Sequence, residues 1–167
     1  MNNRLHVILP LIIFLSVLFS YSGIAQDWTL TVTGKIDSPI DLTPKDFASL
    51  PHLKVSGTDH NGNRNEYDGV PLYTILQKAG VPSGDSLHGK KMLLYLQAEA
   101  LDGYKVVYAL QEVDTAFTDN TIIVADKKNN ELLDSKEGPL QIIVPKEKKH
   151  SRWIRQLRTL RILNSMN

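Results

Sequence analysis

The sequence predicts an α+β fold with a mixed, mainly β core and a few short helices. Two observations favour this class. Short runs rich in β-branched and aromatic residues recur along the chain, and polar turn residues separate them. Segments with the spacing or the capping signals of a helix are few and short. Such a pattern is typical of sheets that carry helices on one face or at one end.

The opening strand and the first helix have clear local signals. Trp28–Gly34 alternates apolar and threonine side chains, as a half-buried strand does. In Thr43–Asp46, Thr43 has the position of an N-cap, and a proline and a capping-box acid follow it. A short helix therefore begins at this segment, and we expect it to end just before Pro51, because the residue preceding a proline avoids helical geometry.

A strand, a turn and a second helix are expected next. Leu53–Thr58 is a strand candidate, and Asn61-Gly62-Asn63 has the composition of a hairpin turn. Pro71–Ala79 places apolar residues on one helical face, and Gly80 supplies the stop. Gly69 is interpreted as the point where the chain turns before this helix.

The second half of the chain is predicted to be mostly strands, with turns at Asp102-Gly103 and at Asp126–Asn130. The strand candidates are Lys91–Ala98, Tyr104–Leu110, Thr121–Ala125, Gln141–Val144 and Leu157–Leu163. Side-chain periodicity then predicts which residues face the core. These residues are Leu72, Ile75, Leu76, Ile122, Val124, Ile142, Val144 and Ile162.

The N-terminus predicts export. Arg4 precedes an apolar run from Leu5 to Phe19, and small residues up to Ala25 give a cleavage motif, so we expect a signal peptide at residues 1–25. Residues 26–167 would then be one domain in the periplasm or outside the cell, with no membrane contact after cleavage. The alternative is an uncleaved N-terminal anchor, although the run is shorter than the roughly 20 residues that span a bilayer.

Composition excludes several classes of site. The chain has 19 basic and 18 acidic residues, a formal net charge of +1, so charge gives no support for nucleic-acid binding. It has no cysteine, which excludes disulfides and thiolate metal sites such as zinc ribbons. Its histidines lack the spacing of a helical metal site, and no nucleophile elbow or phosphate loop is present.

Five landmarks along the chain resemble a known family. They are Gly69-Val70-Pro71-Leu72, Asp102-Gly103-Tyr104, Gly138-Pro139-Leu140, Val144-Pro145 and Arg152-Trp153. In this order and spacing they resemble the oxidoreductase molybdopterin-binding domain shared by sulfite oxidases and the periplasmic methionine-sulfoxide reductase catalytic subunit. The resemblance implies a sulfite-oxidase-like molybdopterin-binding fold, molybdopterin as cofactor and a redox partner protein that the sequence does not identify.

The family holds its molybdenum with one cysteine thiolate, which this chain lacks. Counted back from Gly69, the family cysteine would lie near Gly57. Ser56 or Asp59 would offer a hard oxygen ligand instead, and His60 a nitrogen ligand, but none replaces a soft thiolate. An ordinary molybdenum centre is therefore not expected, and His60 has the alternative interpretation of a polar surface residue beside a turn.

The resemblance also implies which residues line a pocket for a pterin or a small anionic ligand. Residues 146–155 form a basic loop in which the family binds the pterin phosphate, and Arg152 takes the place of the family's lysine before Trp153. Arg64 is the candidate anion-binding arginine, with an exposed salt bridge as its alternative. The expected cofactor-binding residues are His60, Arg64, Asp102, Tyr104, Lys149, Ser151 and Arg152.

Two functions remain open. One is an exported molybdopterin-dependent oxidoreductase or a close relative, with impaired or atypical metal ligation. The other is a non-catalytic binding or accessory domain that kept the fold and lost the cofactor. Fold alone does not separate them.

Overall fold

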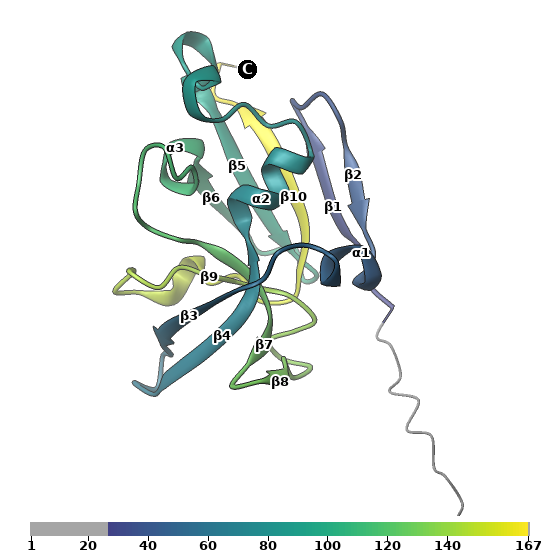
Figure 1. Ribbon diagram of the computed structural model, residues 1–167, viewed down its shortest axis with the longest axis vertical. Helices are drawn as coiled ribbons and strands as arrows, with labels where there is room; N and C mark the ends of the chain where they lie inside the picture. The colour runs from purple at the N-terminus through teal and green to yellow at the C-terminus, as the bar shows by residue number, and fades with distance from the viewer. Residues whose placement is uncertain (1–26, 167) are drawn as a thin grey trace, which may run out of the picture.

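A computed structural model describes residues 27–166 and arranges them as two five-stranded sheets (Figure 1). One sheet has the strand order β2-β1-β10-β5-β6. Its strands are β1 (Leu30–Gly34), β2 (Ile40–Leu42), β5 (Leu94–Ala100), β6 (Lys105–Ala109) and β10 (Leu157–Asn164). The second sheet has the order β3-β4-β7-β8, with β9 also paired to β7. Its strands are β3 (Leu53–Thr58), β4 (Arg64–Pro71), β7 (Ile123–Lys128), β8 (Glu131–Leu132) and β9 (Gln141–Ile143).

The first sheet joins the two ends of the described chain. β1 and β10 pair in parallel with Thr31 opposite Thr159, whereas every other strand pair in this sheet is antiparallel. Leu30 and Val32 are fully buried, while the threonines between them are partly exposed. The alternation that predicted this strand thus places one of its faces against the core.

The second sheet presents the candidate site, and it contains one close backbone approach. Gly69 lies inside β4, and a Cβ atom there would stand 2.1 Å from the carbonyl oxygen of Val124 in β7. The register of β4 against β7 shifts at this position. The expectation that Gly69 makes a turn is therefore wrong, because the glycine instead lets two strands approach each other.

The helices are short. They are α1 (Pro44–Ala48), α2 (Leu72–Lys78), α3 (Leu110–Val113) and the 3₁₀ turns η1 (Gly84–Ser86), η2 (Gly89–Leu93) and η3 (His150–Arg152). The predicted capping box of α1 is confirmed, because Asp46 N donates to Thr43 Oγ1 at 3.2 Å and Thr43 N donates to Asp46 Oδ2 at 3.0 Å. None of the helices in residues 27–166 is long and apolar enough to span a membrane.

The predicted core is confirmed. All eight residues chosen by periodicity are at most 4% exposed, and they belong to one cluster of buried side chains. The strands β2, β4 and β8 and the helix α3 were not predicted, and among the predicted strands β5 and β7 have different bounds. Residues 89–93 form η2 rather than the start of a strand, and β7 continues to Lys128 before a turn at Asn129 and Asn130, which both have positive φ. The predicted signal peptide lies outside the described residues.

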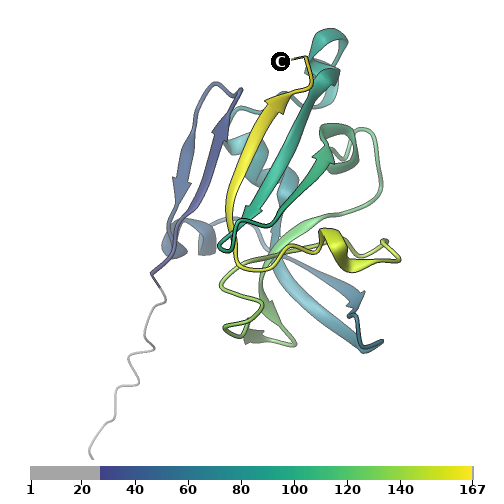
Figure 2. The same cartoon turned by 180° about the vertical axis from the view of Figure 1, so that it is seen from behind.

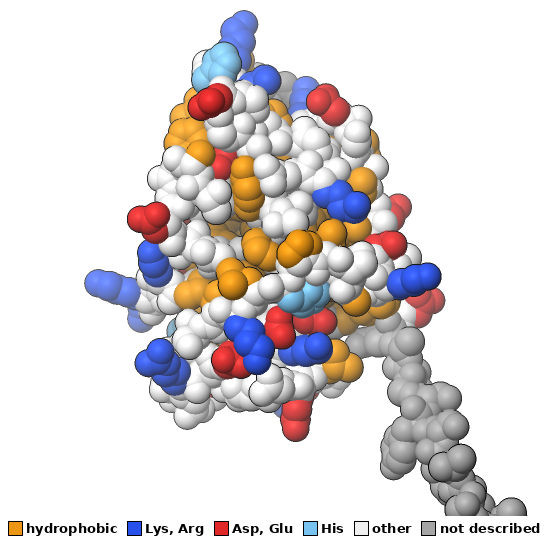
Figure 3. Space-filling model, in the orientation of Figure 1, with side chains coloured by type: hydrophobic (Ala, Val, Ile, Leu, Met, Phe, Trp, Pro, Cys, Tyr) orange, Lys and Arg blue, Asp and Glu red, His pale blue; other side chains and the backbone are white. Residues whose placement is uncertain are grey.

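The surface shows no separation of charge on the face drawn in Figure 3. Basic and acidic side chains are intermixed there, over both sheets. This agrees with the balanced number of acidic and basic residues. Any electrostatic attraction of a ligand would therefore come from a local cluster of charges rather than from the net charge of the protein.

Candidate functional site

The candidate site is a cleft between the β3–β4 turn and the loop that follows β9. Figure 2 shows that these two segments project from the same side of the molecule. Its outer part, here called the outer cleft, encloses about 1210 Å³ of empty space that includes open solvent. The turn contributes lining residues between 58 and 62, and the loop contributes lining residues between 145 and 151. The predicted site residues His60, Lys149 and Ser151 meet here, although they come from distant parts of the chain.

A smaller space, here called the inner pocket, adjoins the outer cleft. It encloses about 400 Å³ and shares Asp59, His60 and His150 with the outer cleft. Its remaining lining residues are Tyr67, Glu137, Gln141, Trp153 and Arg155. Sequence reasoning did not assign Gln141 or Tyr67 to a site. The available signal was a single polar residue within the apolar strand segment that begins at Leu140.

The β3–β4 turn is fixed by a network of hydrogen bonds centred on Asp59. Asp59 Oδ1 accepts from the backbone N–H groups of Asn61 at 3.0 Å and Asn63 at 2.9 Å, and Oδ2 accepts from Asn65 Nδ2 at 3.1 Å. These bonds lower the pKa of Asp59 and keep it ionised, and the bond from the Asn63 backbone N–H has the largest effect. The turn therefore has a defined shape, which places His60 at the mouth of the cleft.

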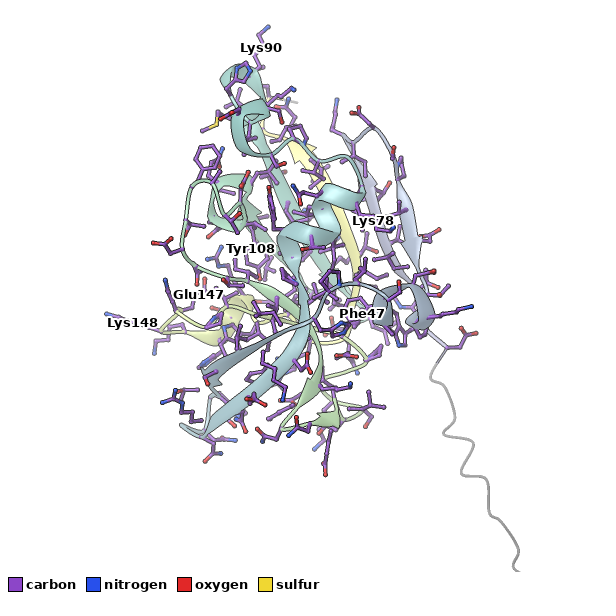
Figure 4. The ribbon with its side chains drawn as sticks, in the orientation of Figure 1. Phe47, Lys78, Lys90, Tyr108, Glu147 and Lys148 are labelled. Atoms are coloured by element: carbon purple, nitrogen blue, oxygen red, sulfur yellow. The ribbon has the colours of Figure 1, made fainter. Side chains whose placement is uncertain are left out.

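The loop after β9 presents two lysines to the outer cleft. Lys148 and Lys149 are both exposed and both line it. In Figure 4, Lys148 extends outward from the loop, whereas Glu147 lies on the side nearer to Tyr108. Ammonium groups on an accessible loop are suited to hold a phosphate by charge-assisted hydrogen bonds.

Arg152 has different surroundings from the two lysines. Its Nη1 and Nη2 atoms bind the two carboxylate oxygens of Glu112 at 2.8 and 3.0 Å, and its Nε binds Glu147 at 2.6 Å. The guanidinium carbon lies 4.7 Å from the ring centroid of Tyr108. The bonds to Glu112 are the largest cause of the raised pKa of Arg152. With two carboxylate partners, Arg152 connects the loop to α3, and a phosphate would have to displace them.

Two tyrosine hydroxyls also bind the backbone of η3, at Ser151 and Arg152. The hydroxyl of the buried Tyr108 donates to the carbonyl oxygen of Arg152, and the Tyr104 hydroxyl donates to the Ser151 carbonyl oxygen at 2.9 Å. Asp102 in turn accepts from the Tyr104 backbone N–H at 2.9 Å. Asp102 and Tyr104 thus do not line the cleft, and they contact it only by way of the Tyr104 hydrogen bond to Ser151. Arg64 is exposed at the start of β4 and does not line either space.

The position at which the resemblance puts the family thiolate, near Gly57, has little room for a side chain. Gly57 is buried in β3, and a Cβ atom there would stand 2.6 Å from Trp153 Cη2 and 3.3 Å from Tyr67 Cε2. The indole is held in place, because its Nε1 donates to the Val144 carbonyl oxygen at 3.1 Å. Since real Cβ atoms essentially never make contacts shorter than 3.0 Å, a cysteine at this position would require Trp153 to move.

Other ligands for a metal are also missing at this end. Ser56 is exposed, and as the neighbour of the inward-facing Gly57 it points to the opposite face of the sheet. Asp59 is occupied by its own turn. Across residues 27–166, no group of three His, Cys, Asp or Glu side chains is arranged to hold a metal ion. The residues present therefore fit the phosphate end of the cofactor but do not fit a thiolate-bound molybdenum.

Comparisons with known proteins agree with this geometry. A family model described as the oxidoreductase molybdopterin binding domain matches residues 19–166. Among solved structures, the chain is similar to the sulfane dehydrogenase SoxCD from Paracoccus pantotrophus, with a TM-score of 0.64 and 21% identity over 81% of this chain. The match covers 38% of that chain, and at this identity it shows the sulfite-oxidase-like fold alone. No curated protein matches.

Proposed function

This chain belongs to the oxidoreductase molybdopterin-binding domain family, and we propose that it is an exported member with a pterin- and anion-binding cleft and impaired molybdenum ligation. The observation that carries the proposal is the contrast within one cleft. Lys148 and Lys149 stand free at the outer end, while Trp153 fills the space beside Gly57 where a thiolate would lie. Export is supported by the Arg4–Ala25 pattern of the sequence.

In this function Lys149, Ser151 and His60 contact the phosphate-bearing end of the ligand. A loop that offers ammonium groups and polar atoms at an open cleft provides the donors that a phosphate requires. Arg152 has a supporting role, since its ion pairs with Glu112 and Glu147 hold the loop that carries Lys149 and Ser151. Because the chain has no cysteine, no thiolate would hold the metal in this cleft.

The test is the metal and pterin content of the mature protein, purified from a host that makes the cofactor. We expect bound pterin with little or no molybdenum and no ordinary sulfite oxidation. Lys149→Ala should weaken the binding of a phosphorylated pterin by about 1.5–3 kcal/mol, the scale of a charged hydrogen bond. Arg158→Ala is the matched control, because Arg158 is exposed and lines neither space. Stoichiometric molybdenum with robust turnover would contradict the proposal.

The second candidate is a non-catalytic binding or accessory domain that serves a partner in the same compartment. Two observations favour it: the chain has no cysteine, and Trp153 occupies the space that a side chain at position 57 would need. The two candidates separate on pterin binding. A protein that binds neither a pterin nor a phosphate, in any preparation, belongs to the second class.

A further inference from the structure

A third enclosed space lies at one end of the first sheet, apart from the cleft. β1 is parallel to β10 and β5 is antiparallel to it, so β1 and β10 begin at the end where the β5–β6 hairpin turns (Figure 2). Residues from these three places, together with Pro139, enclose about 390 Å³ of empty space that includes open solvent, here called the end pocket. Among the described residues it shares no lining residue with the outer cleft or the inner pocket, and the proposed function makes no use of it.

One wall of the end pocket is apolar. Trp28 is partly buried, and its ring packs edge-on to Phe47, with the ring centroids 5.7 Å apart, so the core holds the indole in place. Pro139 and the buried Leu157 extend this wall, and Leu101 adds a side chain that is 57% exposed. An aromatic ring and aliphatic side chains that no other element covers provide a surface for the apolar part of a small ligand.

Gln156, which also lines the end pocket, has a backbone conformation that residues other than glycine rarely adopt. Its φ is 48°, in the left-handed region. Its backbone N–H donates to the Glu137 carbonyl oxygen at 2.9 Å, its own carbonyl oxygen accepts from the Leu101 N–H at 3.0 Å, and its Nε2 donates to the Ser135 carbonyl oxygen at 2.8 Å. Residues held in such a conformation are concentrated at functional sites, ligand-binding sites among them. Here the three bonds fix the start of β10, the strand that carries Arg158.

Two opposite charges line the end pocket without pairing. Asp27 and Arg158 are both exposed, and neither forms an ion pair with any residue in 27–166. A guanidinium presents paired N–H donors that match a carboxylate, and a carboxylate accepts hydrogen bonds from an ammonium group. The charges of the end pocket therefore suit a ligand that carries both an anionic and a cationic group.

We propose that the end pocket binds a free amino acid with an apolar side chain. Arg158 binds the α-carboxylate and Asp27 binds the α-ammonium group, while the apolar side chain of the ligand packs on Trp28 and Leu101. A residue inside a peptide carries neither of these α-charges, and a terminal residue carries only one of them. The two charges together therefore select the free amino acid over a peptide.

The test compares three small molecules that carry the same phenyl group. L-Phenylalanine has both α-charges, 3-phenylpropionate lacks the ammonium group, and phenethylamine lacks the carboxylate. Calorimetry on the full mature protein at neutral pH should show L-phenylalanine binding at least about tenfold more tightly than either of the others, the factor expected for one charged hydrogen bond.

Each charge of the end pocket has its own variant. Arg158→Gln should remove the advantage of L-phenylalanine over phenethylamine, and Asp27→Asn should remove its advantage over 3-phenylpropionate. Leu101→Ser should weaken all three ligands by a similar factor, because it reduces the apolar wall and leaves both charges in place. The three substituted residues are exposed, so circular dichroism should show an unchanged fold in every variant.

A control variant separates this inference from the proposed function. Lys149→Ala removes a residue of the outer cleft and should leave the binding of all three ligands unchanged. If it weakens L-phenylalanine, the ligand occupies the cleft and the end-pocket assignment is wrong. Equal binding of the three ligands by the wild type would overturn the two-charge assignment, as would a preference that survives both Arg158→Gln and Asp27→Asn. If the wild type binds none of the three, the inference is wrong, and the pterin and metal tests of the proposed function are unaffected.

Discussion

The two ends of the cleft use the same loop in opposite ways. At the outer end, Lys148 and Lys149 extend into solvent and have the freedom to meet a ligand. At the inner end, Trp153 is 6% exposed and packs on Gly57 and Tyr67, so it belongs to the core. Arg152, between them, is bound to two carboxylates. The sequence therefore does not tell which basic or aromatic residues of this loop would bind a ligand and which support the fold. The residues that each one contacts in the structure do.

The largest expected effect tests the inner end. Trp153→Ala removes a buried indole that packs against Tyr67, and it should lower the free energy of unfolding by about 3–5 kcal/mol, the range for buried aromatic truncations. Urea unfolding followed by circular dichroism measures this. A loss below about 0.5 kcal/mol is typical of an exposed site, and it would mean that the indole is not part of the core.

The closed thiolate position is the second test. Gly57→Cys forces the new Cβ against Trp153 Cη2 and should destabilise the fold by about 1–3 kcal/mol, as overpacking does. In a Trp153→Ala background the same substitution should cost much less, because the obstructing ring is gone. A double-mutant cycle gives the coupling between the two positions. Additive effects would show that the indole does not occupy the thiolate's place.

The third test compares two basic residues of one loop. Arg152→Ala leaves Glu112 and Glu147 without their shared cation and should cost about 1–3 kcal/mol of stability. Lys149→Ala removes an exposed side chain and should change stability by less than about 0.5 kcal/mol. Thermal unfolding of both variants in the absence of ligand checks the pair. Equal effects would contradict the division of the loop into a structural and a binding part.

The smallest effect at neutral pH concerns Tyr67. Burial is the main cause that raises its pKa to about 12, above the ordinary value of 10.0. The unfolded chain therefore loses this proton first, and the contribution of Tyr67 to stability, complete below pH 10, falls as the pH rises toward 12. Ultraviolet titration of the phenolates should show a group near pH 12 that Tyr67→Phe removes, while burial raises the pKa of Tyr108 still further, so that it ionises later. A titration without such a group would place Tyr67 in solvent.

Much of the fold could be predicted because its signals are local. The capping box at Thr43, the alternation in β1 and the eight buried core residues all depend on spacing along the chain, which periodicity reads directly. Gly69 was misread because its role, a close approach to Val124, depends on a strand more than fifty positions away. The start of β5 was misplaced because Lys91–Leu93, which the predicted strand included, instead belongs to the 3₁₀ turn Gly89–Leu93.

By itself, then, the sequence determined most of the strands, the helices α1 and α2, the inward faces, the family pattern and the absence of any thiolate, but not β2, β4, β8 or α3. Only the tertiary structure decided what each site residue touches. It paired Arg152 with Glu112, forty positions away, set Trp153 over Gly57, and buried the Gln141 Oε1 atom without a hydrogen-bond partner among residues 27–166. The physical reason is that side-chain burial repeats with the period of the backbone, whereas contacts between distant segments depend on how the two sheets and their loops pack.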